Sequence, residues 1–207
     1  MANANTPFGL RPISYMSGAP WGGAARTYYV PVGNSTALYF GDPVNLVAAS
    51  SDGNGIPTAE IATGGSAHQI LGSFVGISNN AGLATIPLLQ SQTPYLAAGQ
   101  AAYIYVTDDP FLLYEVQEDS VGGSITSDNA SSANANLIAG AGSTATSESG
   151  WLLDSSTVGH GGSDPTLQVR IIQALQQVDN AIGNYCKWLV KINQGVSAFT
   201  NPNSGGT

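Results

Sequence analysis

Glycine and proline interrupt this chain so often that strands joined by turns are favoured over long helices. The 207 residues include 26 glycines and 11 prolines, which weaken or break helices and favour turns. Between these residues lie short runs rich in Val, Ile, Tyr and Phe, which are typical of strands. The runs cover residues 26–32, 37–40, 43–48, 70–77, 84–89, 102–107, 112–118, 167–177 and 187–193. The pattern predicts a mainly β fold, a β-barrel or β-sandwich with at most short helices.

Alternation within two of these runs predicts which side chains face the core. Residues 102–107 place Ala102, Ile104 and Val106 on one face and Tyr103, Tyr105 and Thr107 on the other. Because the second face is amphipathic, we expect it at a wet surface or an interface. The last run places Trp188, Val190 and Ile192 on one face. In residues 167–177 the first part predicts a strand, and residues 173–177 fit either its end or a short helical turn.

Composition divides the chain into an arm, a β domain and a tail. Residues 1–25 predict an extended N-terminal arm, because prolines at 7, 12 and 20 exclude a regular helix while aromatic residues recur. Residues 26–193 form the expected β domain. Within it, residues 119–166 are rich in Gly, Ser and Asn and predict a long insertion or a set of weak strands pinned by Ile125, Leu137, Ile138 and the run 151–153. Residues 194–207 predict a flexible C-terminal tail.

The charge of the chain limits its partners. Net charge is −8, charged residues make up only 9% of the chain, and no Lys or Arg occurs from residue 27 to 169. This argues against nucleic acid, whose binding depends on basic side chains that neutralise phosphates. The uneven distribution either guides docking to a partner or reflects how few charges there are. No run of about 18 apolar residues predicts a membrane span, and the N-terminus lacks the pattern of a signal peptide, so we expect synthesis in a cytoplasm.

Few residues have the chemistry of an active site. A hydrolase is a weak alternative, because His160 lies near Ser163 and Asp164 but no G-x-S-x-G elbow is present, and His68 lies in a turn-like segment. Residues 140–145 match a loose dinucleotide motif without the required strand and helix, so we expect no cofactor. A single cysteine, Cys186, excludes an internal disulfide and predicts a buried apolar residue.

Clustered acidic residues are the remaining candidates for a metal site. These are Asp108, Asp109, Glu115, Glu118 and Asp119. They lack the spacing of an EF-hand. Asp109 precedes a proline, a combination typical of turns. We therefore expect no metal and no catalytic residue.

Segments spread over most of residues 6–194 resemble one group of proteins. The resemblance is carried by an ordered set: TPFGLRPISYMSGAPWGGAARTYYVP, GDPVNLV, ILGSFVGI, YVTDDPFLLYEVQED and DNAIGNYCKWLVKIN. The set resembles structural proteins of tailed bacteriophages that are encoded near the head genes. The resemblance implies a non-enzymatic virion protein on the outer surface of the phage head, a decoration or cement protein that stabilises the capsid. The alternative is another virion component, such as a minor capsid, tail or receptor-binding protein.

The arm carries the residues we expect to contact the capsid. These are Phe8, Arg11, Tyr15 and Trp21, together with Arg26, because aromatic and arginine side chains dominate binding energies. The expected partner is the major capsid protein. Head lattices present local three-fold positions, which favours a homotrimer. In the competing interpretation the arm packs on its own barrel, or swaps between subunits, and the β domain makes the capsid contact.

Overall fold

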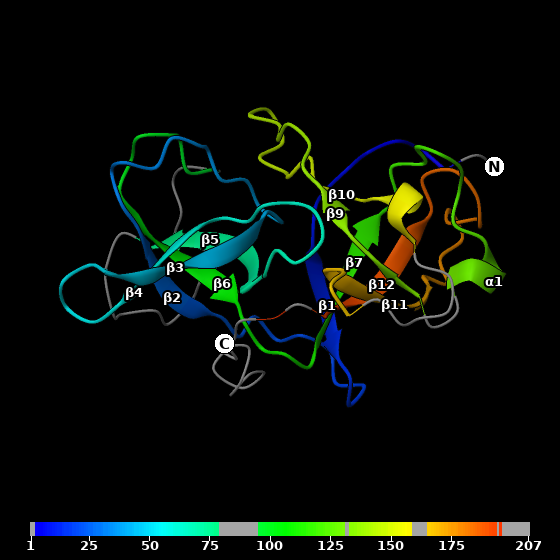
Figure 1. The fold of residues 1–207 in the computed structure, drawn as a ribbon, viewed down its shortest axis with the longest axis horizontal. Coiled ribbons are helices and arrows are strands. Elements are labelled where there is room, and N and C mark those ends of the chain that lie inside the picture. Colours follow the sequence, from blue (N-terminus) through cyan, green and yellow to red (C-terminus); the bar gives the residue numbers. More distant parts are fainter. Residues whose placement is uncertain (1–2, 79–94, 131–132, 159–164, 194, 196–207) are drawn as a thin grey trace.

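The chain folds into two β lobes placed side by side (Figure 1). The computed structural model describes residues 3–78, 95–130, 133–158, 165–193 and 195. Strands dominate these residues and the helical segments are short, which confirms the predicted mainly β class. The expected β domain of residues 26–193 extends over both lobes, each with its own hydrophobic core, and the second lobe also contains a strand from the arm.

The first lobe is a closed five-stranded barrel. Its strands are β2 (Arg26–Val30), β3 (Pro43–Ser51), β4 (Pro57–Ile61), β5 (Gly72–Ser78) and β6 (Ala102–Thr107). They close in the order β2-β4-β3-β5-β6, with β2 antiparallel to β6 and parallel to β4. The core includes Phe74, Ile104 and Val106, all fully buried. Closure removes free strand edges from this lobe.

The second lobe is built on a five-stranded sheet in the order β1-β7-β12-β11-β8. These strands are β1 (Arg11–Tyr15), β7 (Leu112–Gln117), β12 (Lys187–Ile192), β11 (Val169–Ala174) and β8 (Asn134–Ala135). Two further short strands, β9 (Leu137–Ile138) and β10 (Leu152–Leu153), pair with each other. The helical segments are α1 (Ser127–Ala130) and a 3₁₀ turn, η1 (Ser155–Thr157). This five-stranded sheet therefore joins strands from both ends of the chain.

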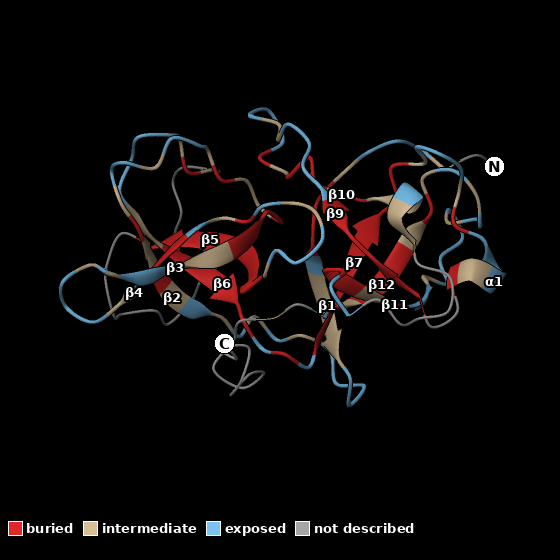
Figure 2. Cartoon of the chain, viewed as in Figure 1, coloured by how far each residue is buried: buried red, intermediate tan, exposed pale blue. Residues whose placement is uncertain are grey.

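The central strands are buried along most of their length (Figure 2). Trp188, Val190 and Ile192 all lie in the core of the second lobe, as predicted. On β6, Ile104 and Val106 face the barrel core, also as predicted. On the opposite face, expected at a wet surface or an interface, Tyr103 is partly exposed while Tyr105 and Thr107 are buried. For Thr107 the reason is contact with the second lobe, where its hydroxyl lies 3.2 Å from the Tyr114 hydroxyl.

Several predicted strand limits were wrong. Residues 37–40 form only isolated bridges, at Leu38 with Leu96 and at Phe40 with Glu148. The sequence patterns did not predict β1 or β4, and β11 ends at Ala174 with no helical turn after it. The predicted strand at 84–89 lies outside the described residues.

The arm is part of the fold rather than a separate extension. Its residues 11–15 form β1, which pairs antiparallel with β7. Leu10 is fully buried in the core of the second lobe. The chain therefore adopts the competing arrangement, in which the arm packs on its own domain.

The segment 119–166 is pinned at several of the expected anchors. Ile125, Leu137, Trp151 and Leu153 are buried in the second lobe, whereas Ile138 is 41% exposed. Residues 159–164 of this segment lie outside the described residues. The expected tail 194–207 also lies outside them, except for Gly195, which forms an isolated β-bridge with Ile70. Within the described part of the chain, no helix has the length and apolar character needed to cross a bilayer.

Candidate functional site

Polar side chains fix the start of the arm along the second lobe. The Asn3 side chain donates to the carbonyl oxygens of Ala181 and Asn184 at 2.7 and 2.9 Å. The Gln117 side chain accepts from the backbone N–H of Thr6 at 2.9 Å and donates to the Ala4 carbonyl at 2.8 Å. These contacts set the path by which the arm enters the space between the two lobes.

The arm crosses the barrel at a pair of glycines. The Leu10 N–H donates to the Gly41 carbonyl at 2.7 Å, and the Ser73 hydroxyl donates to the Leu10 carbonyl at 2.6 Å. Gly9 and Gly41 have φ of +70° and +93°. A Cβ added at Gly9 would lie 2.2 Å from the Gly41 oxygen, and one at Gly41 would lie 2.1 Å from the Phe8 oxygen. Only glycine permits this approach of two backbones.

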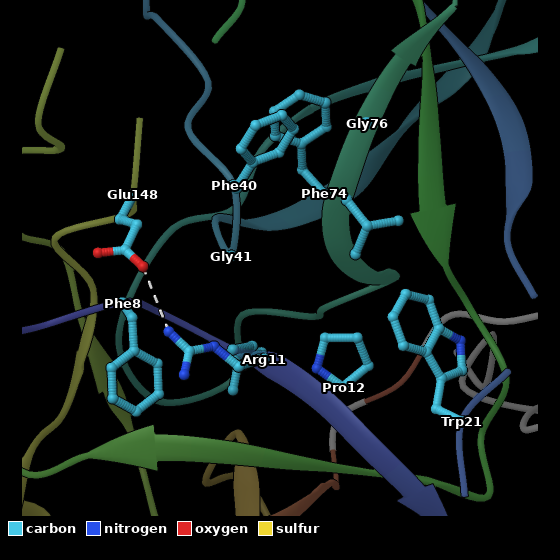
Figure 3. Close-up of a pocket in the computed structure, with 11 residues that line it drawn as sticks. Phe8, Arg11, Pro12, Trp21, Phe40, Gly41, Phe74, Gly76 and Glu148 are labelled. Atoms are coloured by element: carbon cyan, nitrogen blue, oxygen red, sulfur yellow. Dashed lines mark hydrogen bonds and ion pairs between the residues drawn. The ribbon is translucent and has the colours of Figure 1, made fainter. Parts of the chain in front are cut away.

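A pocket of about 230 Å³ opens beside this crossing (Figure 3). Its walls come from the arm, from the barrel and from the loop before Trp151. The barrel supplies a stacked pair, Phe40 and Phe74, whose ring centres lie 5.4 Å apart. The lining residues are Phe8, Leu10, Arg11, Pro12, Trp21, Phe40, Gly41, Phe74, Val75, Gly76 and Glu148. Most of these side chains are apolar, so the pocket suits an apolar group.

Arg11 supplies the charge at the rim of the pocket. Its guanidinium lies over the Phe8 ring, 4.3 Å from the ring centre. It is 3.3 Å from a carboxylate oxygen of Glu148 and 3.9 Å from one of Glu115. Glu115 is buried, and burial raises the pKa of its carboxyl while Arg11 opposes that rise. Two carboxylates thus share one cation.

A hairpin that begins in β1 leads from the pocket to an exposed tip. Trp21 lies in the pocket wall and is held by two hydrogen bonds. Its backbone N–H donates to the Ile13 carbonyl at 2.8 Å, and its ring N–H donates to the Ala24 carbonyl at 3.0 Å. Met16, at the turn of the hairpin, and Phe111, in the loop between β6 and β7, are 56% and 60% exposed, and we call this pair the tip. The Met16 N–H donates to the Phe111 carbonyl at 2.9 Å. The hairpin projects beyond the lobe at the bottom of the view in Figure 1.

The structure brings together three of the five predicted capsid-contact residues. Phe8, Arg11 and Trp21 all line the pocket, although Phe8 is only 6% exposed. Tyr15 packs partly buried against the second lobe at the base of the hairpin. Arg26 begins β2 instead, and its guanidinium lies 3.4 Å from the carboxylate of Asp108.

Sequence patterns did not single out the rest of the pocket. Phe40, Phe74 and Glu148 are far from the arm in sequence and meet it only in the fold. Glu148 comes from the small polar segment, which had no signal for a binding residue. Two backbone hydrogen bonds hold its loop against the first lobe. The N–H of Phe40 donates to the Ser147 carbonyl at 3.0 Å, and the N–H of Ser149 donates to the Phe40 carbonyl at 2.9 Å.

Two buried acids lie at structural positions outside the pocket. Glu118 is fully buried and accepts from the ring N–H of Trp188 at 3.0 Å and from the N–H of Ile125 at 3.2 Å. Burial raises its pKa to about 7, against the opposing effect of these bonds. Asp42 accepts from the N–H of Tyr39 at 2.7 Å, and burial raises its pKa to about 6 despite this bond and one from Ser149.

Where the structure describes them, the catalytic and metal-binding candidates named from the sequence occupy structural positions. Cys186 is buried, as predicted, and burial raises the pKa of its thiol to about 11. Asp119 accepts from the N–H of Val121 and Asp109 from the N–H of Phe111, so both bond to the backbone two residues further on, and Asp119 also accepts from Ser155. His68 is exposed, and His160, Ser163 and Asp164 lie outside the described residues. No group of three or more His, Cys, Asp or Glu within the described ranges is arranged to hold a metal ion.

Comparison with known proteins adds no relative. The chain matches no protein-family model, no curated protein and no solved structure.

Proposed function

We propose that this chain is a non-enzymatic structural protein of a tailed-phage virion, which binds the outside of the head as a decoration or cement subunit. The major capsid protein is its partner, and three copies assemble around a local three-fold position of the lattice. The resemblance of residues 6–194 to phage head proteins supports the location. The geometry supports a binding role through the surface described next.

The observation that carries the proposal is the exposed apolar pair that forms the tip. Met16 lies at the turn of the hairpin and Phe111 lies in the loop between β6 and β7, and one backbone hydrogen bond holds them together. Large apolar side chains in such a position gain stability when a partner covers them. We place the capsid contact at this tip, rather than along the whole arm, because residues 3–10 are already bonded to or packed on the chain's own second lobe and barrel.

An add-back experiment tests the proposal. Purified chain is mixed with heads of the encoding phage that were assembled without it, and the bound fraction is measured after sedimentation. We expect saturable binding to heads, weakened about tenfold or more by the double variant Met16→Ser, Phe111→Ser, because hot-spot residues contribute more than 1 kcal/mol each. Val178→Ser is the control, since Val178 is fully exposed between β11 and β12 and outside the tip. Chain that stays unbound, or binds purified tails instead, overturns the proposal.

A further inference from the structure

We infer that the pocket beside the arm crossing binds one apolar side chain, aromatic or branched aliphatic, from an extended partner segment that carries a lysine or arginine next to it. The inference deepens the proposed function, on which it rests for the identity of the partner as a segment of the capsid shell. The chemistry of recognition itself is argued from the pocket alone.

The size of the pocket matches a single side chain. Its volume is about 230 Å³. A cavity of about 150 Å³ lined by apolar residues holds one benzene ring. Around the space lie Phe8, Pro12 and Trp21 on one side and the stacked pair Phe40 and Phe74 on the other (Figure 3). Rings on both sides favour a planar or branched apolar group, which they contact over large faces.

The walls are fixed before any partner arrives. Phe74 is fully buried and stacked on Phe40, and Leu10 is bonded through both its N–H and its carbonyl to the barrel. The glycine crossing sets the spacing between arm and barrel. A pocket that needs no rearrangement loses less conformational entropy on binding.

Charge at the rim selects a cationic neighbour. Glu148 is about half exposed and turns one carboxylate oxygen toward Arg11 and the other away from it, as Figure 3 shows. Arg11 also lies near Glu115, so its positive charge is divided between two acids. A lysine or arginine beside the inserted side chain therefore meets an incompletely neutralised carboxylate.

The charge of the whole chain acts in the same direction. At a net charge of −8 it attracts basic segments more strongly than acidic ones. A partner segment with a basic residue fits the pocket better than another copy of this chain does.

Three capped dipeptides test this chemistry on the isolated full-length chain. They are N-acetyl-Phe-Arg-amide, N-acetyl-Phe-Glu-amide and N-acetyl-Ala-Arg-amide, each titrated by ligand-observed NMR to give a Kd. We expect Phe-Arg to bind about two- to fivefold more tightly than Phe-Glu, the range that one exposed ion pair provides. Ala-Arg is expected to bind at least about tenfold more weakly than Phe-Arg, because it lacks the ring.

Two pairs of variants locate the binding. Trp21→Ala removes one wall and is expected to weaken Phe-Arg binding about tenfold, whereas Val178→Ala, at a fully exposed position outside the pocket lining, leaves it unchanged. Glu148→Gln is expected to abolish the preference for Phe-Arg over Phe-Glu. Asp128→Asn removes the same charge from the exposed α1 and preserves that preference.

The outcomes separate this inference from the proposed function. Equal binding of Phe-Arg and Phe-Glu, or unchanged binding to the Trp21→Ala variant in its folded state, overturns the inference even if the chain decorates heads. Selective peptide binding that depends on Trp21 and Glu148 supports it even if the add-back to heads fails. In that case the recognition chemistry stands and the proposed partner is wrong.

Discussion

Gly9 and Gly41 hold two backbones closer together than any side chain allows. Both residues have positive φ, and a carbonyl oxygen of the opposing backbone segment occupies the space where a Cβ would lie. The pocket lies beside this crossing, so its shape depends on two residues that contribute no side chain.

Replacing Gly41 with alanine tests this dependence. We expect Gly41→Ala to lower the free energy of unfolding by about 2–4 kcal/mol, because it combines a strained φ with a Cβ 2.1 Å from the Phe8 oxygen. Gly53→Ala is the matched control, since Gly53 has φ of +84° with no atom within 4 Å of the added Cβ. It is expected to cost only about 1–2 kcal/mol. Urea denaturation measures both, and equal losses would show that close approach is unimportant.

Glu118 makes the stability of the second lobe depend on pH. Its pKa is raised from 4.5 to about 7 by burial, so the folded chain binds a proton more tightly than the unfolded chain. The resulting stabilisation is complete below pH 4.5 and is lost as pH rises through about 7. Glu118→Gln keeps an oxygen for the Trp188 ring N–H but cannot titrate.

We expect the Glu118→Gln variant to show a smaller fall in the free energy of unfolding between pH 5 and pH 8 than the original chain, because its side chain binds no proton in this range. Denaturation curves at several pH values measure the fall. Glu60→Gln, at an exposed position on β4, controls for the loss of one acidic side chain. An unchanged slope in Glu118→Gln would contradict the burial of a titrating carboxyl at this position.

The first strand ties the N-terminal arm to both lobes. β1 pairs with β7 at one edge of the sheet, and the residue before it, Leu10, is buried in the core of the second lobe and bonded to the barrel. The outer edge of β1 is also occupied, because the backbone N–H groups of Tyr15 and Trp21 bond to Ala19 and Ile13 within the hairpin. The arm therefore acts as a core element and not as a free anchor.

Deletion of residues 1–25 is expected to abolish cooperative unfolding, because it removes β1 and a fully buried leucine whose loss alone costs about 2–5 kcal/mol. Thermal circular dichroism measures this directly. Met16→Ser changes only an exposed side chain of the same segment and is expected to keep the original transition. A truncated chain that still unfolds cooperatively would show that the arm is dispensable for folding.

Local patterns predicted the central strands but not the strands whose formation depends on tertiary contacts. Alternation identified the buried face of β12 because Trp188, Val190 and Ile192 stand at every second position. β1 contains Pro12, and β4 is a short segment with few large apolar residues, so neither has a clear strand signal. Both are defined by their neighbours in space.

The pocket was predictable only in part for the same reason. Aromatic and arginine residues in the arm indicated binding chemistry, and Phe8, Arg11 and Trp21 do line one side. The facing side comes from the barrel and from the loop that contains Glu148. Glu148 is more than 100 residues away from the arm in sequence. Only the three-dimensional fold brings these segments together.

The two lobes present different surfaces of one acidic molecule. The barrel is closed, whereas the second lobe extends the hairpin with its apolar tip and, together with the barrel, forms the pocket at the base of that hairpin. We propose that tip and pocket face the same partner. A net charge of −8 then favours docking on a basic region of the capsid shell.

A cryo-electron-microscopy reconstruction of the encoding phage's virion tests the central claim most directly. The account predicts density for this chain on the outer surface of the head, in three copies around local three-fold positions, with the tip at Met16 and Phe111 against the major capsid protein. Density for the chain in the tail, inside the shell, or as a single copy attached through the far end of the barrel would contradict it.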